Sequence, residues 1–488
     1  MYLGLDIGTS GIKGVIIDDQ QRMIATAEAP LSISRPQAGW SEQNPADWLT
    51  ATQQVFERLH AQHGRALAGV RGIGLSGQMH GAVLLDEKDV PLRPCILWND
   101  VRSAAQCVQL EQVAPFRKIT GNILMPGFTA PKLAWVRIHE PDIFARVKSV
   151  FLPKDYVRLW LTGARGMDMS DASGTGWLDV AARAWSQELL EAAGLPLTGV
   201  PPLLEGSAAA GHLRRALQIR WGMTDDVVVA AGGGDNAATA CGLGVLDPGV
   251  GFISLGTSGV VFAATDSFAP NTRQAVHAFC HAVPNRWHQM GVILSATDSL
   301  TWLAGIAQST PAELSARVPD DVTAPSSVLF LPYLSGERTP HNDAQVRGGF
   351  VGLDRAHSAG DLTQAVMEGV AFALADCLAA LTGAGTHLPS VYITGGGAQS
   401  PAWCRIIANV MNMTLLCCDD AHRGAAFGAA RLGMMAAMNV ESTSLCTPPE
   451  VKQEITPQAD LVGAYQERYA QYQAFYPPLA AYGTTDKT

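Results

Sequence analysis

A carboxylate that follows three glycines is the residue of this sequence best suited to acid–base chemistry. The segment 227–236 predicts a buried strand that ends in Gly232-Gly233-Gly234 and delivers Asp235 at the start of a helix. Asp235 could simply cap that helix. Three consecutive glycines cost conformational entropy that a cap does not require, so we expect a substrate to approach the backbone there. An aspartate placed against an acceptor hydroxyl can take its proton during phosphoryl transfer, and we predict this role for Asp235.

A second chemical feature is a Gly-Thr-Ser-Gly turn that occurs twice. Residues 7–12 are Ile-Gly-Thr-Ser-Gly-Ile, and residues 255–260 are Leu-Gly-Thr-Ser-Gly-Val. Apolar segments flank both turns, so each predicts a β-hairpin. Backbone N–H groups in such turns can point at the oxygens of a triphosphate, with the hydroxyls as extra donors. We therefore predict two phosphate loops, formed by Gly8, Thr9 and Ser10 and by Gly256, Thr257 and Ser258.

The two turns differ in the residue that precedes them. Asp6 lies at the end of the first predicted strand, whereas Ser254 holds the corresponding place in the second copy. Asp6 could be a turn residue that bonds the backbone. The apolar strand before it and the asymmetry of the repeat favour a carboxylate that orients Mg²⁺, usually through water, beside the phosphates.

Several common site types are missing from the sequence. There is no Gly-x-x-x-x-Gly-Lys-Ser/Thr motif of a P-loop enzyme and no dinucleotide-binding glycine motif after the first strand, which disfavours a nicotinamide-dependent oxidoreductase. A formal net charge of −10 argues against a nucleic-acid partner. His277, Cys280, His281 and His288 suggest a metal, but a strand would place His277 and His281 on one face and Cys280 on the other. We interpret these four residues as structural.

The candidate site residues lie in a chain that is predicted to consist of two similar halves. A chain of 488 residues is too long for one compact core. Predicted strands at Tyr2–Ile7 and Ile12–Ile17 flank the first turn, and others at Gly251–Leu255 and Val260–Ala264 flank the second. Two copies spaced by half the chain indicate a duplication. The turn residues at 246–249 indicate a boundary, which we place after residue 246.

Around the hairpins, strands alternate with helices. Short buried strands are predicted at Val70–Leu75, Val227–Ala231 and Val391–Thr394, and helices at Asp361–Leu381 and Gly424–Met438. This alternation predicts two α/β domains that face one another.

Composition indicates a well-packed cytoplasmic enzyme. Hydrophobic residues make up 47% and charged residues 16% of the chain. Nine cysteines occur without Cys-x-x-Cys spacing, as expected of reduced thiols in the cytosol. The segment Met1–Asp6 carries an acid and no preceding basic region, which predicts a strand and not a signal peptide. No stretch of 18 apolar residues predicts a membrane span.

The C-terminal region predicts a helix with an aromatic face. Tyr465, Tyr469, Tyr472 and Tyr476 fall at helical spacing, which favours a packing face over a ligand site. We expect Pro477-Pro478 to stop this helix and Thr484–Thr488 to form a loose tail.

Taken in order, the motifs resemble those of the FGGY carbohydrate kinases, over nearly the whole chain. Within that family, the segment Gly77-Gln78-Met79-His80-Gly81 is most similar to the xylulokinase branch. The other motifs that carry the resemblance are Leu5–Ser10, Ile96–Asp100, Gly127–Leu133, Gly232–Asn236, Leu255–Gly259, Leu331–Arg338, Gly349–Leu353 and Thr394–Ser400.

The resemblance implies an α/β fold of two duplicated actin/hexokinase-like (ribonuclease H-like) domains that face one another across an interdomain cleft. Residues 1–246 would form the sugar-binding domain. Residues 247–488 would form the ATP-binding domain, with a C-terminal helix and a short tail.

The same resemblance implies roles for matching positions. Asp235 matches the catalytic base and Asp6 the acid important for Mg-ATP. Met79, His80 and Asn236 match sugar-binding positions, with His80 in an open polar loop where several donors could converge on a sugar. The adenosine part of ATP would be held by Gly395, Gly396, Gly397 and Ala398, with the two Gly-Thr-Ser-Gly turns on its phosphates.

We therefore expect an ATP- and Mg²⁺-dependent kinase that converts D-xylulose to D-xylulose 5-phosphate. The expected partners are the sugar and ATP, with a possible homodimer by resemblance and no membrane or nucleic acid. One alternative is a kinase of the same family for ribulose, gluconate or glycerol. A second is a non-catalytic nucleotide switch or filament protein on the same actin-like scaffold, although the sugar loop and Asp235 argue against it.

Overall fold

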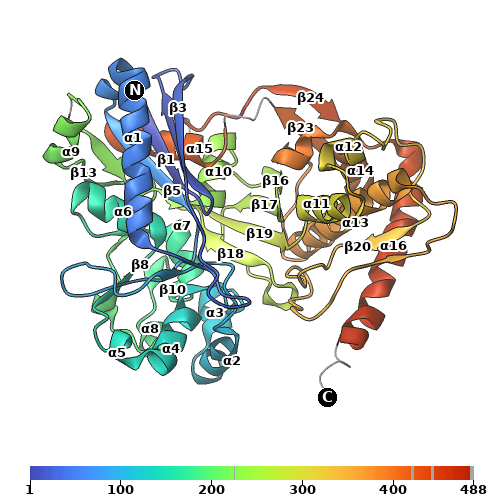
Figure 1. Ribbon diagram of the computed structural model, residues 1–488, viewed down its shortest axis with the longest axis horizontal. Helices are drawn as coiled ribbons and strands as arrows, with labels where there is room; N and C mark the ends of the chain where they lie inside the picture. The colour runs from blue at the N-terminus through green and yellow to red at the C-terminus, as the bar shows by residue number, and fades with distance from the viewer. Residues whose placement is uncertain (225, 419–422, 441–444, 484–488) are drawn as a thin grey trace.

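Two mixed β-sheets, one from each half of the chain, form the framework of the molecule (Figure 1). The computed structural model describes residues 1–224, 226–418, 423–440 and 445–483. The first sheet has the order β13 (Ala209–His212), β14 (Val228–Ala230), β5 (Gly72–Gly77), β1 (Tyr2–Ile7), β2 (Gly11–Ile17) and β3 (Met23–Pro30), with β15 (Gly233–Gly234) also on β5. The second has the order β18 (His277–Cys280), β19 (Trp287–Ile293), β17 (Gly259–Thr265), β16 (Gly251–Leu255), β22 (Ser390–Thr394), β23 (Thr414–Cys418) and β24 (Val451–Ile455).

The two sheets share one topology, which confirms the duplicated fold. In the first, β1 pairs antiparallel with β2 and parallel with β5, and β5 is followed by parallel β14 and antiparallel β13. In the second, β16 pairs antiparallel with β17 and parallel with β22, followed by parallel β23 and antiparallel β24. Both Gly-Thr-Ser-Gly turns therefore connect the first two strands of equivalent sheets.

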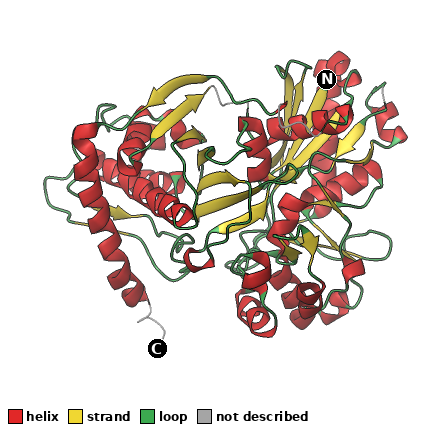
Figure 2. Cartoon of the chain, turned by 180° about the vertical axis from the view of Figure 1, so that it is seen from behind, coloured by secondary structure: helices red, strands yellow, loops and turns green. Residues whose placement is uncertain are grey.

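Helices cover both sheets and fill the region beside the first one, as the view from behind shows (Figure 2). In the first half they are α1 (Pro45–Ala68), α2 (Ala104–Val113), α3 (Phe116–Thr120), α4 (Thr129–His139), α5 (Pro141–Phe144), α6 (Pro153–Thr162), α7 (Met169–Ala172), α8 (Gln187–Ala193), α9 (Arg215–Arg220) and α10 (Asp235–Leu243). In the second half they are α11 (Thr297–Ile306), α12 (Pro311–Ser315), α13 (Ala359–Thr382), α14 (Pro401–Met411), α15 (Ala425–Met438) and α16 (Ala459–Gly483).

Short strand pairs complete the fold. They are β4 (Glu42–Gln43) with β7 (Cys95–Ile96), β6 (Val83–Leu85) with β8 (Ser149–Phe151), β9 (Met167–Asp168) with β12 (Leu203–Leu204), β10 (Leu178–Asp179) with β11 (Ala184–Trp185), and β20 (Leu329–Leu331) with β21 (Gly349–Val351).

Helix α15 belongs to the second half of the sequence but packs on the first sheet, beside α10 (Figure 1). Small residues permit this close contact. A Cβ at Gly74 of β5 would lie 1.8 Å from the carbonyl oxygen of Ala429, and a Cβ at Gly428 would lie 1.7 Å from that of Ala238. The two halves are thus interlocked through α10 and α15, and the domain boundary after residue 246 stays a prediction.

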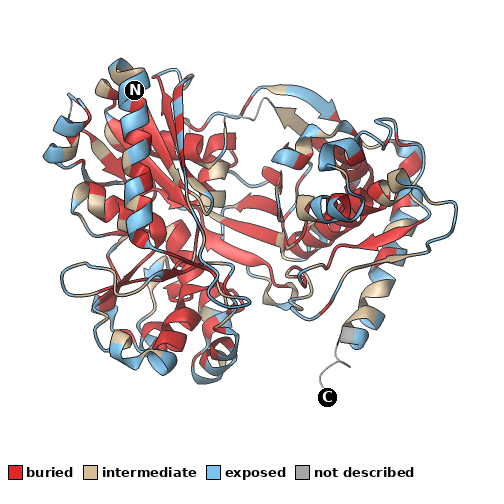
Figure 3. Ribbon diagram, viewed as in Figure 1, coloured by how far each residue is buried: buried red, intermediate tan, exposed pale blue. Residues whose placement is uncertain are grey.

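Helix α13 forms the centre of the second half. Sixteen of its 24 residues are buried, and it packs against β17, β19 and β20 (Figure 3). In the part of the chain that the structure describes, it is the one helix long and apolar enough to cross a membrane by length and composition, and 83% of its apolar window is buried. Burial of this kind is typical of a core helix.

The aromatic face of the C-terminal helix is confirmed as a packing face. Tyr465 and Tyr472 of α16 are buried in the core of the second half. The predicted stop at Pro477-Pro478 is wrong, because α16 continues to Gly483. These prolines remove two backbone donors, but on an exposed helix end water can satisfy the carbonyls that they leave free. The predicted tail, Thr484–Thr488, lies outside the described residues.

Candidate active site

The four residues predicted to contact the sugar line one cavity between the two halves. Its volume is about 150 Å³. Met79, His80, Asp235 and Asn236 belong to the first half of the chain. The remaining lining residues are Trp98 from the first half and Ser258, Val260, His277, Phe279, Met290, Val292 and Arg338 from the second. The structure therefore brings the predicted sugar residues together and closes the cavity with residues far away in sequence.

Asp235 is the first residue of α10, and its carboxylate does not cap the helix. The N-cap position is Gly234, without a side-chain cap bond. The Oδ1 atom of Asp235 accepts from the backbone N–H of Asn236 at 2.7 Å and from its Nδ2 at 2.9 Å. Burial, and secondarily the negative charge of Asp6, raise the pKa of Asp235 to about 7. A carboxyl group with this pKa can take up and release a proton near neutral pH.

Close packing within the chain accounts for part of the three-glycine segment before Asp235. Gly232 has a φ of 92°, and a Cβ there would lie 2.2 Å from the carbonyl oxygen of Leu75. A Cβ at Gly234 would lie 2.9 Å from the sulfur of Met79. Close packing therefore requires glycine at position 232, whereas the neighbour of Gly234 is the flexible side chain of Met79. The approach of a substrate to this segment stays a prediction.

Asp6 lies on β1 and lines a second cavity, of about 450 Å³, together with Gly8, Ser10 and Lys13. Its Oδ1 atom accepts a hydrogen bond from Ser76 Oγ at 2.7 Å. Burial raises the pKa of Asp6, against the opposing effects of Ser76 and Lys13. Two partly desolvated carboxylates, Asp6 and Asp235, thus lie close enough to influence each other, an arrangement that favours a bound cation.

The backbone and ring of His80 are both fixed. His80 has a φ of 70°, and Thr129 Oγ1 and Lys132 Nζ donate to its carbonyl oxygen at 3.1 and 2.9 Å. Its Nδ1 lies 2.7 Å from the carbonyl oxygen of Gly174, and its ring stacks on Phe128 at 4.8 Å. Burial lowers the pKa of His80 to about 3, so the ring is neutral. Since Nδ1 donates to a carbonyl, Nε2 is left as an acceptor.

The turn at residues 8–11, predicted to bind phosphate, is hydrogen-bonded directly to the loop 77–81 that carries Met79 and His80. Thr9 Oγ1 donates to Gln78 Oε1 at 3.0 Å and accepts from Trp98 Nε1 at 3.1 Å. Gln43 Nε2 donates to the carbonyl oxygen of Thr9 at 2.7 Å. The hydroxyl hydrogen of Thr9 is therefore engaged inside the protein, whereas the side chain of Ser10 is exposed. Of the two hydroxyls in this turn, Ser10 is the better placed to donate to a phosphate.

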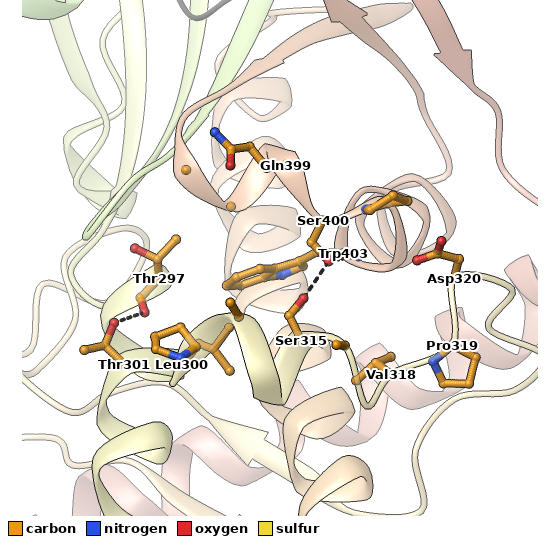
Figure 4. Close-up of a pocket in the computed structure, with 16 residues that line it drawn as sticks. Thr297, Leu300, Thr301, Ser315, Val318, Pro319, Asp320, Gln399, Ser400 and Trp403 are labelled. Atoms are coloured by element: carbon orange, nitrogen blue, oxygen red, sulfur yellow. Dashed lines mark hydrogen bonds between the residues drawn. The ribbon is translucent and has the colours of Figure 1, made fainter. Parts of the chain in front are cut away.

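A third and larger cavity, of about 820 Å³, lies between α11, α12 and the start of α14 (Figure 4). Of the predicted adenosine segment, Gly396 and Gly397 line this cavity, and a Cβ at Gly396 would meet nothing within 4 Å. Gly395 has a φ of 96°, and its Cβ would lie 2.6 Å from the carbonyl oxygen of Leu255. Ala398 is not among the lining residues; it packs against the core of the second half.

The second phosphate loop is tied to one wall of this large cavity. Thr297, which lines it at the start of α11, donates from its backbone N–H and its Oγ1 to the carbonyl oxygen of Gly256 at 2.9 and 2.8 Å. The backbone N–H of Ala296 donates to the carbonyl oxygen of Thr257 at 2.8 Å. Ser258 of the same loop lines the small cavity with Asp235. The loop 256–258 thus lies between the large cavity and the small cavity that contains Asp235.

Comparison with known proteins identifies the family. The N-terminal domain model of the FGGY family of carbohydrate kinases matches residues 1–242, and the C-terminal domain model matches residues 251–437. The chain belongs to the FGGY family of carbohydrate kinases. The xylulose kinase of Escherichia coli strain K12 is 46% identical over 484 residues, which cover 98% of this chain and 99% of that protein.

Solved structures agree with this membership. The crystal structure of a "xyloylose kinase" from Brucella ovis matches at a TM-score of 0.96 and 53% identity, covering 98% of this chain and 99% of the other. Plasmodium falciparum glycerol kinase with ADP matches at a TM-score of 0.87 but 16% identity, a likeness of fold alone. As an FGGY kinase, the chain is an enzyme that uses ATP to phosphorylate a carbohydrate.

Part of the cavity of this FGGY kinase is not evident from the sequence. The sequence predicts a structural role for His277, yet this residue lines the cavity, as do Trp98, Phe279 and Arg338. The motif 331–338 ends at Arg338, but nothing in its local pattern shows which cavity the side chain reaches. Among the described residues, no three His, Cys, Asp or Glu side chains form a group that could hold a metal ion. The structural interpretation of Cys280, His281 and His288 stays a prediction.

A buried polar chain supports the backbone in front of Asp235. The backbone N–H of Gly234 donates to Ser170 Oγ at 3.0 Å, and Ser170 Oγ in turn bonds Asp168 Oδ2. The other oxygen of Asp168 lies 2.6 Å from Lys154 Nζ, and all three side chains are fully buried. Because these groups are buried, each bond restricts the position of β15, the strand that directly precedes Asp235.

Replacing Ser170 with alanine should lower kcat about 5- to 50-fold by leaving the Gly234 N–H unpaired and loosening Asp235. The matched control is Thr175→Val, which removes a buried hydroxyl that accepts from the backbone N–H of Trp177 in the same region. Steady-state kinetics and thermal unfolding of both variants test this role. A loss of stability in both with equal kcat values would make Ser170 merely structural, whereas Ser170→Thr should retain most activity.

Proposed function

We propose that this FGGY kinase transfers the γ-phosphoryl group of ATP to D-xylulose and forms D-xylulose 5-phosphate. The observation that carries the proposal is the small cavity in which Asp235, with a pKa raised to about 7, lies beside Met79, His80 and Asn236. The choice of sugar is supported by the curated relatives at 46% and 47% identity, both named xylulose kinase.

The proposed reaction is an in-line transfer that starts at a sugar hydroxyl in the small cavity. Asp235 would accept the proton of the attacking hydroxyl, and Asn236 and the Nε2 atom of His80 would bind other hydroxyls of the sugar. The turns at residues 8–11 and 256–259 would bind the phosphates through backbone N–H groups. The adenosine part would occupy the large cavity beside Gly396 and Gly397, with Gly395 shaping the turn that leads there.

Asp6 is the proposed residue for Mg²⁺, and its environment fits the ion. Its half-buried carboxylate accepts a hydrogen bond from Ser76 Oγ. The carboxylate of Asp235 lies close enough for the two negative charges to interact. Mg²⁺ in kinases is held by one or two carboxylates together with water and substrate phosphates, so no larger cluster is required. When bound, the ion would neutralise charge on the phosphates.

A substrate panel tests the proposal. ADP release is measured with D-xylulose, L-xylulose, D-ribulose, L-ribulose, gluconate and glycerol, and the highest kcat/KM is expected for D-xylulose. Preference for another member of the panel would replace xylulose as the substrate and leave the kinase in place. Nucleotide-dependent assembly without turnover of any sugar would favour the actin-like switch instead.

We also propose a cellular compartment for the enzyme and expect a particular oligomeric state. We place it in the cytoplasm, where its nine cysteines, which form no disulfide among the described residues, would remain reduced. The expected homodimer stays a prediction.

A further inference from the structure

The second half of the chain contributes a cation to the wall of the sugar cavity. Arg338 lies in the loop after β20 and lines the cavity. The buried carboxylate of Glu337 fixes this loop, because its Oε1 accepts from the backbone N–H groups of Leu294 at 3.0 Å and of Arg338 at 2.8 Å. The backbone that carries the guanidinium is therefore attached to the end of β19.

The guanidinium of Arg338 makes a weak hydrogen bond to His277. Its Nη1 lies 3.4 Å from Nε2 of His277. The charge of the neighbouring Glu337 acts on Arg338, but within the described chain Arg338 forms no ion pair with a carboxylate at 4.0 Å or less. Burial lowers the pKa of His277 well below its usual range, so this ring is neutral and accepts from Arg338. Arginine has five N–H donors, and this weak contact leaves most of them available to a ligand.

His277 also joins Arg338 to the sugar loop through an aromatic wall. Its ring packs against Phe279 and Phe128, with centroid distances of 5.2 and 5.8 Å. Phe128 in turn stacks on His80 at 4.8 Å. The wall is thus continuous from Arg338 to His80. The charge of Arg338 is among the causes that lower the pKa values of His80 and His277. The pKa of Asp235, by contrast, is raised chiefly by burial and by the charge of Asp6.

The two sides of the cavity offer different hydrogen-bonding chemistry. Asp235, Asn236 and the Nε2 atom of His80 provide acceptors, which suit sugar hydroxyls. Arg338 is a donor only. An open-chain ketose has one oxygen that carries no hydrogen, its carbonyl oxygen, and this atom suits a donor-only partner better than any hydroxyl does.

We infer that Arg338, oriented by His277, binds the carbonyl oxygen of an open-chain ketose in this cavity. The inference rests on the proposed function in taking a ketose as the substrate. It makes Arg338 a residue that distinguishes a ketose from the polyol of the same carbon skeleton, since the polyol presents a hydroxyl in place of the carbonyl.

The test is calorimetric binding of D-xylulose and of xylitol to the full chain without ATP. Arg338→Met should weaken D-xylulose binding about 10- to 100-fold and change xylitol binding much less. Arg338→Lys, which keeps the charge but loses the planar fork, should lie between Arg338→Met and the unmodified enzyme. His277→Phe keeps the aromatic packing and loses the acceptor for Arg338, so its effect should be smaller and less than additive with that of Arg338→Met.

The matched control is Arg347→Met, an exposed arginine of the same loop whose guanidinium bonds backbone carbonyls, and it should bind both ligands normally. Unchanged D-xylulose binding by Arg338→Met would overturn the inference. Equal losses of affinity for D-xylulose and xylitol would also overturn it, because Arg338 would then bind a hydroxyl. A raised KM for ATP alone would overturn it too, because Arg338 would then bind a phosphate. Binding without ATP separates this test from the proposed function, which fails only if the unmodified enzyme does not turn over D-xylulose.

Discussion

Asp235→Asn is expected to lower kcat about 10²- to 10⁴-fold, the usual contribution of a general base. The substitution keeps the shape of the side chain and its contact with Asn236, but an amide cannot take the proton of the attacking hydroxyl. The adenosine cavity lies between other elements, so the affinity for ATP should stay near normal. Coupled ADP release measures turnover, and fluorescence titration with a nucleotide analogue measures binding.

The control for this variant is Asp266→Asn, which changes an exposed aspartate that bonds only its neighbour Ser267 among the described residues. It should leave both quantities unaltered. Near-normal kcat in Asp235→Asn would remove Asp235 from the mechanism as the base.

The same assignment predicts a pH dependence. A base works in its deprotonated form, and the pKa of Asp235 is raised to about 7 by burial and by Asp6. Activity should therefore rise with pH through the region around 7 and level off above it, the opposite of the profile of a general acid. The kcat/KM profile of the unmodified enzyme should show this acidic limb, and the residual activity of Asp235→Asn should not.

Local patterns were enough to predict the elements that carry the site. The strand Tyr2–Ile7 begins and ends as predicted, and α13 and α15 differ from the predicted helices by at most two residues at either end. Strands of alternating or continuous apolar character and helices of apolar period depend on nearby residues, which a sequence displays directly.

Long-range packing could not be predicted in the same way. Gly232 is required by the carbonyl oxygen of Leu75, and Gly428 by that of Ala238, contacts between residues far apart in the chain. For the same reason the local sequence around His277 and Arg338 does not show that both line the cavity with Asp235. Which residues meet across two halves depends on how the halves pack, and no local period encodes that.

Asp6→Asn is expected to reduce kcat/KM for Mg-ATP by a factor of about 10² or more, because the phosphates lose an anionic partner for their cation. The amide retains a carbonyl oxygen that can accept from Ser76, so the end of β1 should keep its structure. Titration of activity with Mg²⁺ should show half-maximal activity at a much higher concentration. Glu28→Gln is the matched control, since Glu28 lines the same cavity as an exposed carboxylate paired with Lys13.

Asp6→Asn should also alter the pH profile through Asp235. The negative charge of Asp6 raises the pKa of Asp235, so its removal should lower that pKa and move the acidic limb of the residual activity to lower pH. Glu28→Gln lies outside this effect, because Glu28 is not among the groups that shift the pKa of Asp235. If the Mg²⁺ requirement changes but the acidic limb does not move, Asp6 acts on Mg-ATP without influencing the protonation of Asp235. An unchanged Mg²⁺ requirement would remove Asp6 from the handling of Mg-ATP, because the charge of a carboxylate at that position is the whole basis of the proposed role.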